Sequence, residues 1–144
     1  MFEVDPNSQA NLGEVTTDHV HLDLAVDFAR KRLAGTATYA LRALAATHEV
    51  VLDTAHLEIQ AARLTGADGQ SRPLPIDTST VHAVYGTALR LALPAPAAAG
   101  DSLAIEIDYA TTPSGGAIQF LSPEQTLGKA HPYLFTQCEE IHAR

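Results

Sequence analysis

The segment HVHLDLAVDF, residues 19–28, alternates apolar and polar side chains along most of its length. Its apolar set is Val20, Leu22, Leu24, Val26 and Phe28, and its polar set is His19, His21, Asp23 and Asp27. Successive side chains of a strand point to opposite faces of a sheet, so this alternation predicts a β-strand with one face toward a core.

The same period of two recurs in four other segments, 36–41, 57–61, 89–93 and 103–109. Val50-Val51-Leu52 is instead a continuous apolar run, which is typical of a strand buried on both faces. Turn signals separate these segments: Arg30–Arg32, Gly66–Gly69, Pro73–Pro75, Pro94–Asp101 and Pro113–Gly116. This pattern predicts an all-β fold, either a sandwich or an open saddle of mixed or antiparallel sheets. The alanines around residues 43–46 favour at most one turn of helix.

The bulk composition limits the classes of function. A chain of 144 residues predicts one domain, residues 1–144, with its own core. The single cysteine, Cys138, precludes an internal disulfide and fits a reducing cytoplasm. A net charge of −8 argues against a nucleic-acid partner, which needs clustered basic residues. No secretory signal or apolar run of about 18 residues occurs, so we expect a cytoplasmic protein without a membrane partner.

Residues 117–144 differ in character from the rest of the chain. They contain Ser122-Pro123-Glu124-Gln125 and His131-Pro132-Tyr133 and show no regular alternation. We therefore predict an irregular C-terminal segment. Polar segments on a rigid scaffold often carry function.

Two pairings in the sequence are candidates for chemistry. Cys138 and His142 are four residues apart, the spacing of a thiol and its base on one helix face. The spacing alone shows neither a lowered thiol pKa nor an orienting third group, so a buried cysteine near an unrelated histidine is the preferred interpretation. His19, His21 and Asp23 share a strand face that could in principle hold a metal, although no further ligand can be assigned. No HExxH sequence is present. The residues alone therefore assign neither a catalytic nor a metal-binding side chain.

Glu139 and Glu140 are adjacent carboxylates near the C-terminus. Neighbours on an extended chain face opposite ways, so they are not expected to act on one another as acid and base. From the residues alone the pair has no assigned function.

A long block of sequence resembles a known family. The block Ser122–Thr126, Gly128-Lys129 and His131–Glu139, with Ile141, His142 and Arg144, is similar to the end of the N-terminal domain of zinc aminopeptidases of the leukotriene A(4) hydrolase, aminopeptidase B and aminopeptidase N family. The earlier chain is similar in order and spacing, and the resemblance begins at about Thr17. Its further matching segments are His19–Leu22, Val26–Phe28, Leu33–Ala37, Val51–Thr54 and Ile105–Ile107.

The resemblance implies a role for the whole chain. Members remove N-terminal residues from peptides, and their β-saddle N-terminal domain packs against a thermolysin-like domain that holds the zinc ligands and the general base. None of those residues is in this sequence. We therefore expect a structural, substrate-anchoring domain that is inactive alone, binds no zinc itself and contacts a catalytic domain through Ala117–Arg144.

The resemblance also implies the binding residues for the substrate, a peptide N-terminus. Glu139 corresponds to the side chain that holds the free α-amine, Gln137 lines the same cavity, and Glu140 borders the pocket for the first substrate side chain. Leukotriene A(4) hydrolase has glutamine where this chain has Glu139, which favours peptide over epoxide hydrolysis here. Glu140 stands where many relatives have a small residue, which favours basic or polar first residues.

A carboxylate suits this role on physical grounds. A protonated α-amine offers three donors and a positive charge, and charge-assisted bonds to a carboxylate are stronger than neutral ones. The alternative from a different functional class is a stand-alone, non-enzymatic β-domain that acts as an interaction module.

Overall fold

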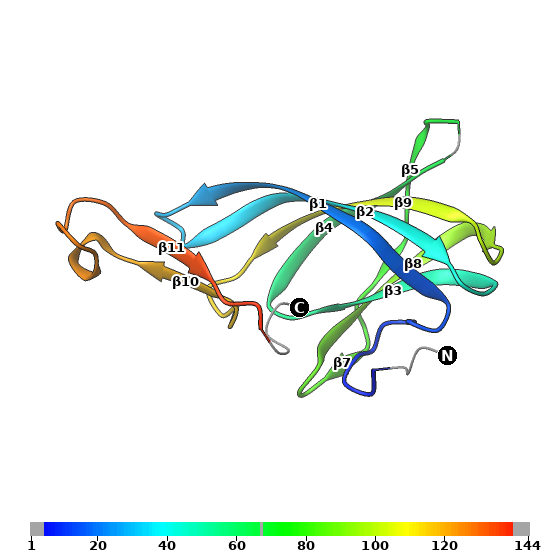
Figure 1. The fold of residues 1–144 in the computed structure, drawn as a ribbon, viewed down its shortest axis with the longest axis horizontal. Coiled ribbons are helices and arrows are strands. Elements are labelled where there is room, and N and C mark those ends of the chain that lie inside the picture. Colours follow the sequence, from blue (N-terminus) through cyan, green and yellow to red (C-terminus); the bar gives the residue numbers. More distant parts are fainter. Residues whose placement is uncertain (1–4, 67, 140–144) are drawn as a thin grey trace.

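The computed structural model describes residues 5–66 and 68–139, and these form three antiparallel sheets (Figure 1). Sheet A contains, in spatial order, β1 (Val15–Asp27), β2 (Arg32–Ala43), β9 (Ser102–Thr111), β4 (Leu57–Thr65) and β5 (Ser71–Pro73). Sheet B contains β3 (Thr47–Thr54), β8 (Gly86–Ala97) and β6 (Ile76–Asp77), and β7 (Val81–His82) also pairs with β8. The third sheet is the hairpin of β10 (Ile118–Leu121) and β11 (Tyr133–Thr136), with a 3₁₀ turn at Pro123–Gln125 between them. The predicted all-β class is confirmed.

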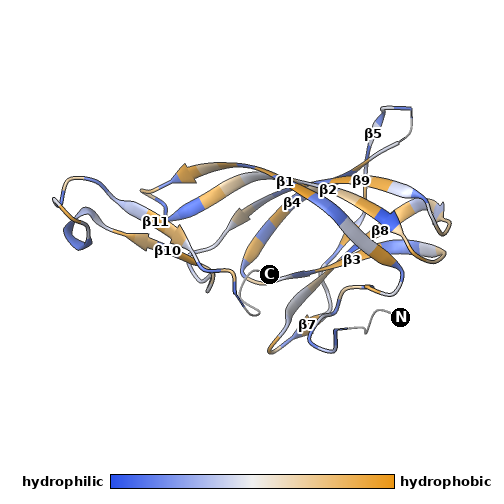
Figure 2. Cartoon of the chain, viewed as in Figure 1, coloured by the Kyte–Doolittle hydropathy of each residue, from blue (hydrophilic) through white to orange (hydrophobic). Residues whose placement is uncertain are grey.

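The hydrophobic core lies between sheet A and sheet B. Ile105 and Ile107 of β9 belong to one buried cluster with Leu89 and Leu91 of β8, and Leu91 and Ile105 are fully inaccessible to solvent. The alternation in residues 36–41, 89–93 and 103–109 places the apolar side chains of these segments toward the core. Figure 2 shows the repeated change between hydrophobic and hydrophilic residues along the strands of sheet A. Val50 and Val51 are both buried, as the continuous apolar run predicts.

A β-bulge in β4 corrects one expectation. The alternation of residues 57–61 predicts that Ala61 shares a face with Leu57 and Ile59. The pairing with β9 shifts between Ile59 and Ala61, and the buried side chain is Ala62 instead. An extra residue in one strand reverses the faces of all that follow, which sequence alternation alone does not reveal.

Two predicted turns also differ from the structure. Strand β8 continues through Pro94 and Pro96 to Ala97, whereas the sequence predicts a turn from Pro94 to Asp101. The prolines lie where the β3–β8 pairing is irregular, between Glu49↔Ala92 and Thr47↔Ala97, so no regular ladder bond is lost. Around residues 43–46 no helical turn forms, because β2 continues to Ala43, whose N–H donates to the carbonyl of Asp101 at 2.8 Å.

The segment after residue 116 is more regular than predicted. It forms the β10–β11 hairpin, which projects from one end of the two-sheet body (Figure 1). In this position the hairpin places residues 137–139 beside the body. In the described residues we find no α-helix, and thus no helix that could cross a bilayer.

Glycine is required at a close approach of β2 to β1. Gly35 has a φ of 156°, and a Cβ at this position would overlap the carbonyl oxygen of Asp23. A larger residue would therefore separate the two strands at this point.

The outer face of sheet A carries an ion-pair network across three strands. The Arg63 guanidinium of β4 donates to Asp108 of β9 at 2.7 and 2.9 Å, and it also donates to Glu106. The Thr36 hydroxyl of β2 donates to Asp108 at 3.0 Å. The hydrogen bonds from Arg63, followed by the one from Thr36, lower the pKa of Asp108. The network therefore favours the charged form of the carboxyl group.

We predict that this network makes folding stability depend on pH in acid. The pKa of Asp108 is lower in the folded than in the unfolded chain, so its contribution is complete above the unfolded value of about 3.9 and is lost as pH falls through the folded value. The contribution should be about 1 kcal/mol or less, because the groups are partly exposed.

Urea unfolding midpoints at pH 7, 4 and 2.5 should show this loss. Arg63→Met should reduce the difference between pH 7 and pH 2.5, whereas Arg30→Met, in an exposed pair with Asp27, should change it less. A pH dependence unaffected by Arg63→Met would contradict the prediction.

Candidate substrate-anchoring segment

The predicted binding residues Gln137 and Glu139 lie directly after β11, where the hairpin returns to the body. The N–H of Gln137 donates to the carbonyl of Ala117 at 2.9 Å, which extends the β10–β11 ladder by one bond. The N–H of Glu139 donates to the Gln137 side-chain oxygen at 3.1 Å. These two bonds hold residues 137–139 in a defined local conformation. Glu140 and His142 lie outside the described residues.

The Glu139 side chain lies at the surface of the described part of the chain. The residue is exposed, and within residues 5–66 and 68–139 no group donates a hydrogen bond to its carboxylate. Gln137 is exposed as well, and its amide oxygen faces back toward the Glu139 amide. The arrangement leaves a carboxylate that can accept hydrogen bonds from a cationic amine.

An aromatic contact fixes the hairpin to sheet A. Phe120 of β10 packs edge-on against Phe28, at the end of β1, with ring centroids 6.1 Å apart and planes at 86°. On β11, Tyr133 and Phe135 lie close together, with centroids 6.5 Å apart. Phe120 on β10 therefore attaches the hairpin to sheet A, whereas Tyr133 and Phe135 on β11 stay exposed.

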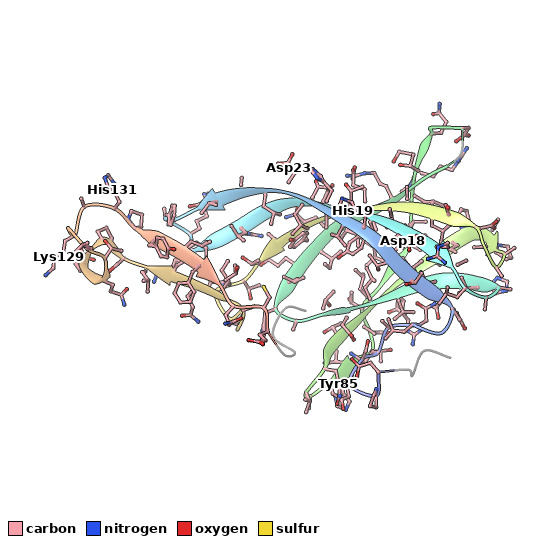
Figure 3. The ribbon with its side chains drawn as sticks, in the orientation of Figure 1. Asp18, His19, Asp23, Tyr85, Lys129 and His131 are labelled. Carbon is pink, nitrogen blue, oxygen red and sulfur yellow. The ribbon has the colours of Figure 1, made fainter. Side chains whose placement is uncertain are left out.

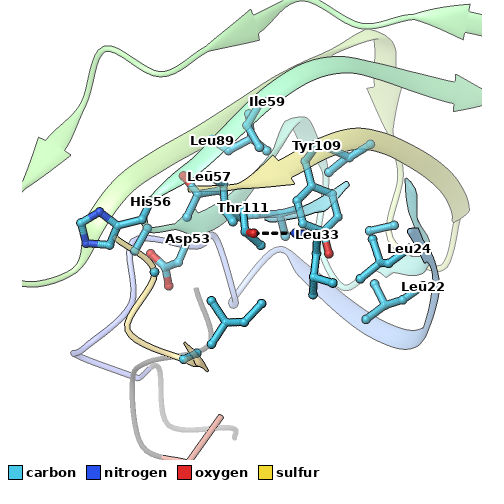
Figure 4. A pocket seen from close by; sticks show the side chains of 18 of the residues that line it. Leu22, Leu24, Leu33, Asp53, His56, Leu57, Ile59, Leu89, Tyr109 and Thr111 are labelled. Carbon is cyan, nitrogen blue, oxygen red and sulfur yellow. Dashed lines mark hydrogen bonds between the residues drawn. The ribbon is translucent and has the colours of Figure 1, made fainter. Parts of the chain in front are cut away.

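The segment borders an open cavity of about 400 Å³ on the inner face of sheet A. Leu22, Leu24 and Leu33 line one side, and Asp53 and His56 lie on another, as Figure 4 shows. The N–H of Leu33 donates to the Thr111 hydroxyl at 3.0 Å between them. Further lining comes from Val20, Tyr39, Leu52, Ile59, Leu89, Ile107, Tyr109, Ile118, Thr136 and Cys138, among others.

The cavity is the main feature of this region that sequence reasoning missed. The alternation in residues 19–28 predicts one apolar face for β1. A pattern within one strand does not indicate how far another sheet covers that face. In the structure Leu22 is 54% exposed and Val26 is 47% exposed. The cavity arises because sheet B covers only part of the inner face.

The described residues do not fit a metal centre. No group of three histidine, cysteine, aspartate or glutamate side chains converges among them. His19 and Asp23 lie on the strand β1 at the upper side of sheet A in Figure 3, away from residues 137–139. Cys138 is a free thiol at the edge of the cavity.

Comparison with known proteins gives a consistent result. A family model described as the peptidase M1 N-terminal domain matches residues 16–144. Leucine aminopeptidase 2 of Yarrowia lipolytica is 37% identical over 142 residues, which is 99% of this chain and 21% of that protein. Leukotriene A-4 hydrolase of Xenopus laevis is 36% identical over 141 residues, which is 97% of this chain and 22% of that protein. The chain thus spans about a fifth of the length of the curated relatives it matches.

Solved structures share the fold. Native leukotriene A4 hydrolase from Saccharomyces cerevisiae superposes with a TM-score of 0.84 at 28% identity, covering 99% of this chain and 22% of that one. An M1 zinc metallopeptidase from Deinococcus radiodurans gives a TM-score of 0.57 at 22% identity, covering 72% of this chain and 22% of that one, a likeness of fold alone.

We predict that the Phe28–Phe120 contact controls the stability of the hairpin. An edge-to-face aromatic pair contributes about 0.5–1.5 kcal/mol beyond its buried area, so Phe28→Ala should speed amide hydrogen exchange in β10 and β11 by about two- to tenfold. Exchange in β9 should be unchanged. Leu127→Ala, at a fully exposed position in the hairpin loop, is the matched control. Faster exchange throughout the sheets, or none in the hairpin, would contradict this role.

Proposed function

The chain belongs to the peptidase M1 N-terminal domain family, and we propose that it is the substrate-anchoring domain of a zinc aminopeptidase that removes N-terminal residues from peptides. The observation that carries the proposal is the placement of Glu139: an exposed carboxylate without a donor among the described residues, held by the ladder that ends at Gln137. The family resemblance implies that this carboxylate holds the substrate α-amine.

The proposed mechanism of this domain is positioning. The α-ammonium of a peptide donates hydrogen bonds to the Glu139 carboxylate, and Gln137 lines the same site. A fixed amine position sets the register of the peptide, so that the first peptide bond is the one presented for hydrolysis. In M1 relatives zinc supplies the hydrolytic chemistry, and its ligands are not found in this sequence.

We also propose that a catalytic domain packs on residues 117–144. Ile118, Phe120, Leu121 and Leu134 are only partly buried within the described chain, and Phe135 is 40% exposed. Exposed apolar side chains that cluster on one element indicate a contact surface. Tyr133 and Leu127 add to this surface at the outer side of the hairpin. A catalytic domain placed there would bring its pocket next to Glu139.

In an aminopeptidase that contains this domain, Glu139→Ala should lower kcat/KM by about tenfold to more than a hundredfold. This corresponds to roughly 1.5–3 kcal/mol, the range for a hydrogen bond to a charged group. The loss should fall on substrates with a free α-amine and should spare N-acetylated ones. Glu139→Gln should retain part of the activity, because the amide oxygen still accepts.

The control is Glu124→Ala, which removes another exposed carboxylate of the same hairpin. Zinc content and melting temperature should be unchanged in each variant. An equal loss on free and blocked substrates, together with a lower melting temperature for Glu139→Ala, would show that Glu139 stabilises the fold rather than the substrate.

We further predict that the 144-residue chain alone hydrolyses no aminoacyl substrate and retains no stoichiometric zinc after dialysis. The reason is that the donor set needed for a tetrahedral site does not converge among its described residues. Elemental analysis and an aminoacyl-anilide assay measure both properties. Turnover by the pure chain would instead indicate an activity of its own.

A further inference from the structure

The backbone of residues 137–139 is held to the hairpin at one point. Gln137 follows the last ladder pair, Ile118↔Thr136, and its N–H donates to the carbonyl of Ala117 at 2.9 Å. Residues 137, 138 and 139 are all exposed, so close packing within the described chain does not restrain them. The position of Glu139 relative to the hairpin therefore depends on how the backbone is held between Gln137 and Glu139.

The side chain of Gln137 supplies this second restraint. Its Oε1 accepts a hydrogen bond from the N–H of Glu139 at 3.1 Å, which joins a side chain to the amide two residues later. Asparagine and aspartate commonly form this bond in Asx-turns, and it fixes the backbone between the two residues. Within residues 5–66 and 68–139 no other hydrogen bond reaches Glu139. The Gln137 side chain therefore connects the anchor at Ala117 to Glu139.

The direction of this bond determines what the Gln137 amide group can do. A backbone N–H only donates, so the oxygen end of the amide faces Glu139. The other end is NH2, which offers only donors, as does the protonated α-amine of a peptide. Two donors do not pair, whereas the carboxylate of Glu139 accepts strong bonds from an ammonium group. The contribution of Gln137 to amine binding therefore acts through Glu139.

We propose that Gln137 is a positioning residue, which sets the place of the Glu139 carboxylate through the backbone and not by contact with the substrate. The inference rests on the proposed anchoring function and deepens it. Without the bond to the Glu139 N–H, residues 137–139 adopt further conformations, and only a fraction of the molecules present the carboxylate in the binding position. Affinity for the substrate amine falls in proportion to that fraction.

Kinetics of an aminopeptidase that contains this domain test the inference. Gln137→Leu removes the acceptor and should lower kcat/KM about three- to tenfold, the range for one neutral hydrogen bond. The loss should fall on substrates with a free α-amine and should spare N-acetylated ones. Gln137→Asn is one methylene shorter but keeps the bond as an Asx-turn, so kcat/KM should stay within about twofold of the parent. A side chain that worked by touching the substrate would lose its reach in Gln137→Asn.

A double-mutant cycle separates action through Glu139 from direct contact. In the Glu139→Ala background, Gln137→Leu should change kcat/KM by less than about twofold, because the carboxylate that it positions is absent. Gln70→Leu, at an exposed position in the β4–β5 turn, is the matched control and should leave kcat/KM unchanged. Equal melting temperatures check that the variants are folded.

The outcomes distinguish this inference from the proposed function. An unchanged kcat/KM in Glu139→Ala would overturn both. Three results would overturn the positioning role while the anchoring role stands: no loss in Gln137→Leu, an equal loss in Gln137→Asn and Gln137→Leu, or a full additional loss in the double variant Q137L/E139A. The last two would assign Gln137 to direct contact with the substrate.

Discussion

The packing of β9 against β8 is the interaction on which the rest of the structure depends. β9 is the central strand of sheet A, paired with β2 on one side and β4 on the other, and its Ile105 and Ile107 face Leu89 and Leu91 across the core. Burial of apolar area of this kind is the largest favourable term in folding. Because β8 is likewise the central strand of sheet B, this contact fixes the position of one sheet on the other.

Sheet B is smaller than sheet A, so it leaves one end of the inner face of sheet A uncovered. Strand β1 is 13 residues long and β2 is 12, whereas sheet B consists of two long strands with short additions. The inner face therefore stays open beyond the sandwich. The cavity, the exposed Leu22 of β1 and the β10–β11 hairpin all lie in this open part. The hairpin is attached there through Phe28, so the residues after β11 are placed at the edge of the cavity.

Charged side chains in this molecule differ in whether they pair with other side chains of the fold. Arg63 pairs with both Glu106 and Asp108 on the outer face of sheet A, where these contacts join two strands. Glu139 has no such partner among the described residues, and its segment is held by the backbone bond from Gln137 to Ala117 and by the bond from the Glu139 N–H to the Gln137 side chain. A carboxylate without a donor among the described residues is open to a cationic ligand, and this supports the proposed anchoring role.

The sequence by itself determined the central strands, the class of fold and the family. Alternation in 19–28, 36–41 and 103–109 reports which side chains share a face, because the period of two is a local property of an extended backbone. The family block near Glu139 is likewise visible in the sequence.

Only the tertiary structure decided which residues pair between strands and which faces of the sheets are covered. Three features depend on a partner strand: the β4 bulge that turns Ala62 rather than Ala61 toward the core, the continuation of β8 through its prolines, and the β10–β11 hairpin. The open inner face of β1 depends on where sheet B ends. These features result from contacts between residues far apart in the chain, and a local pattern does not contain them.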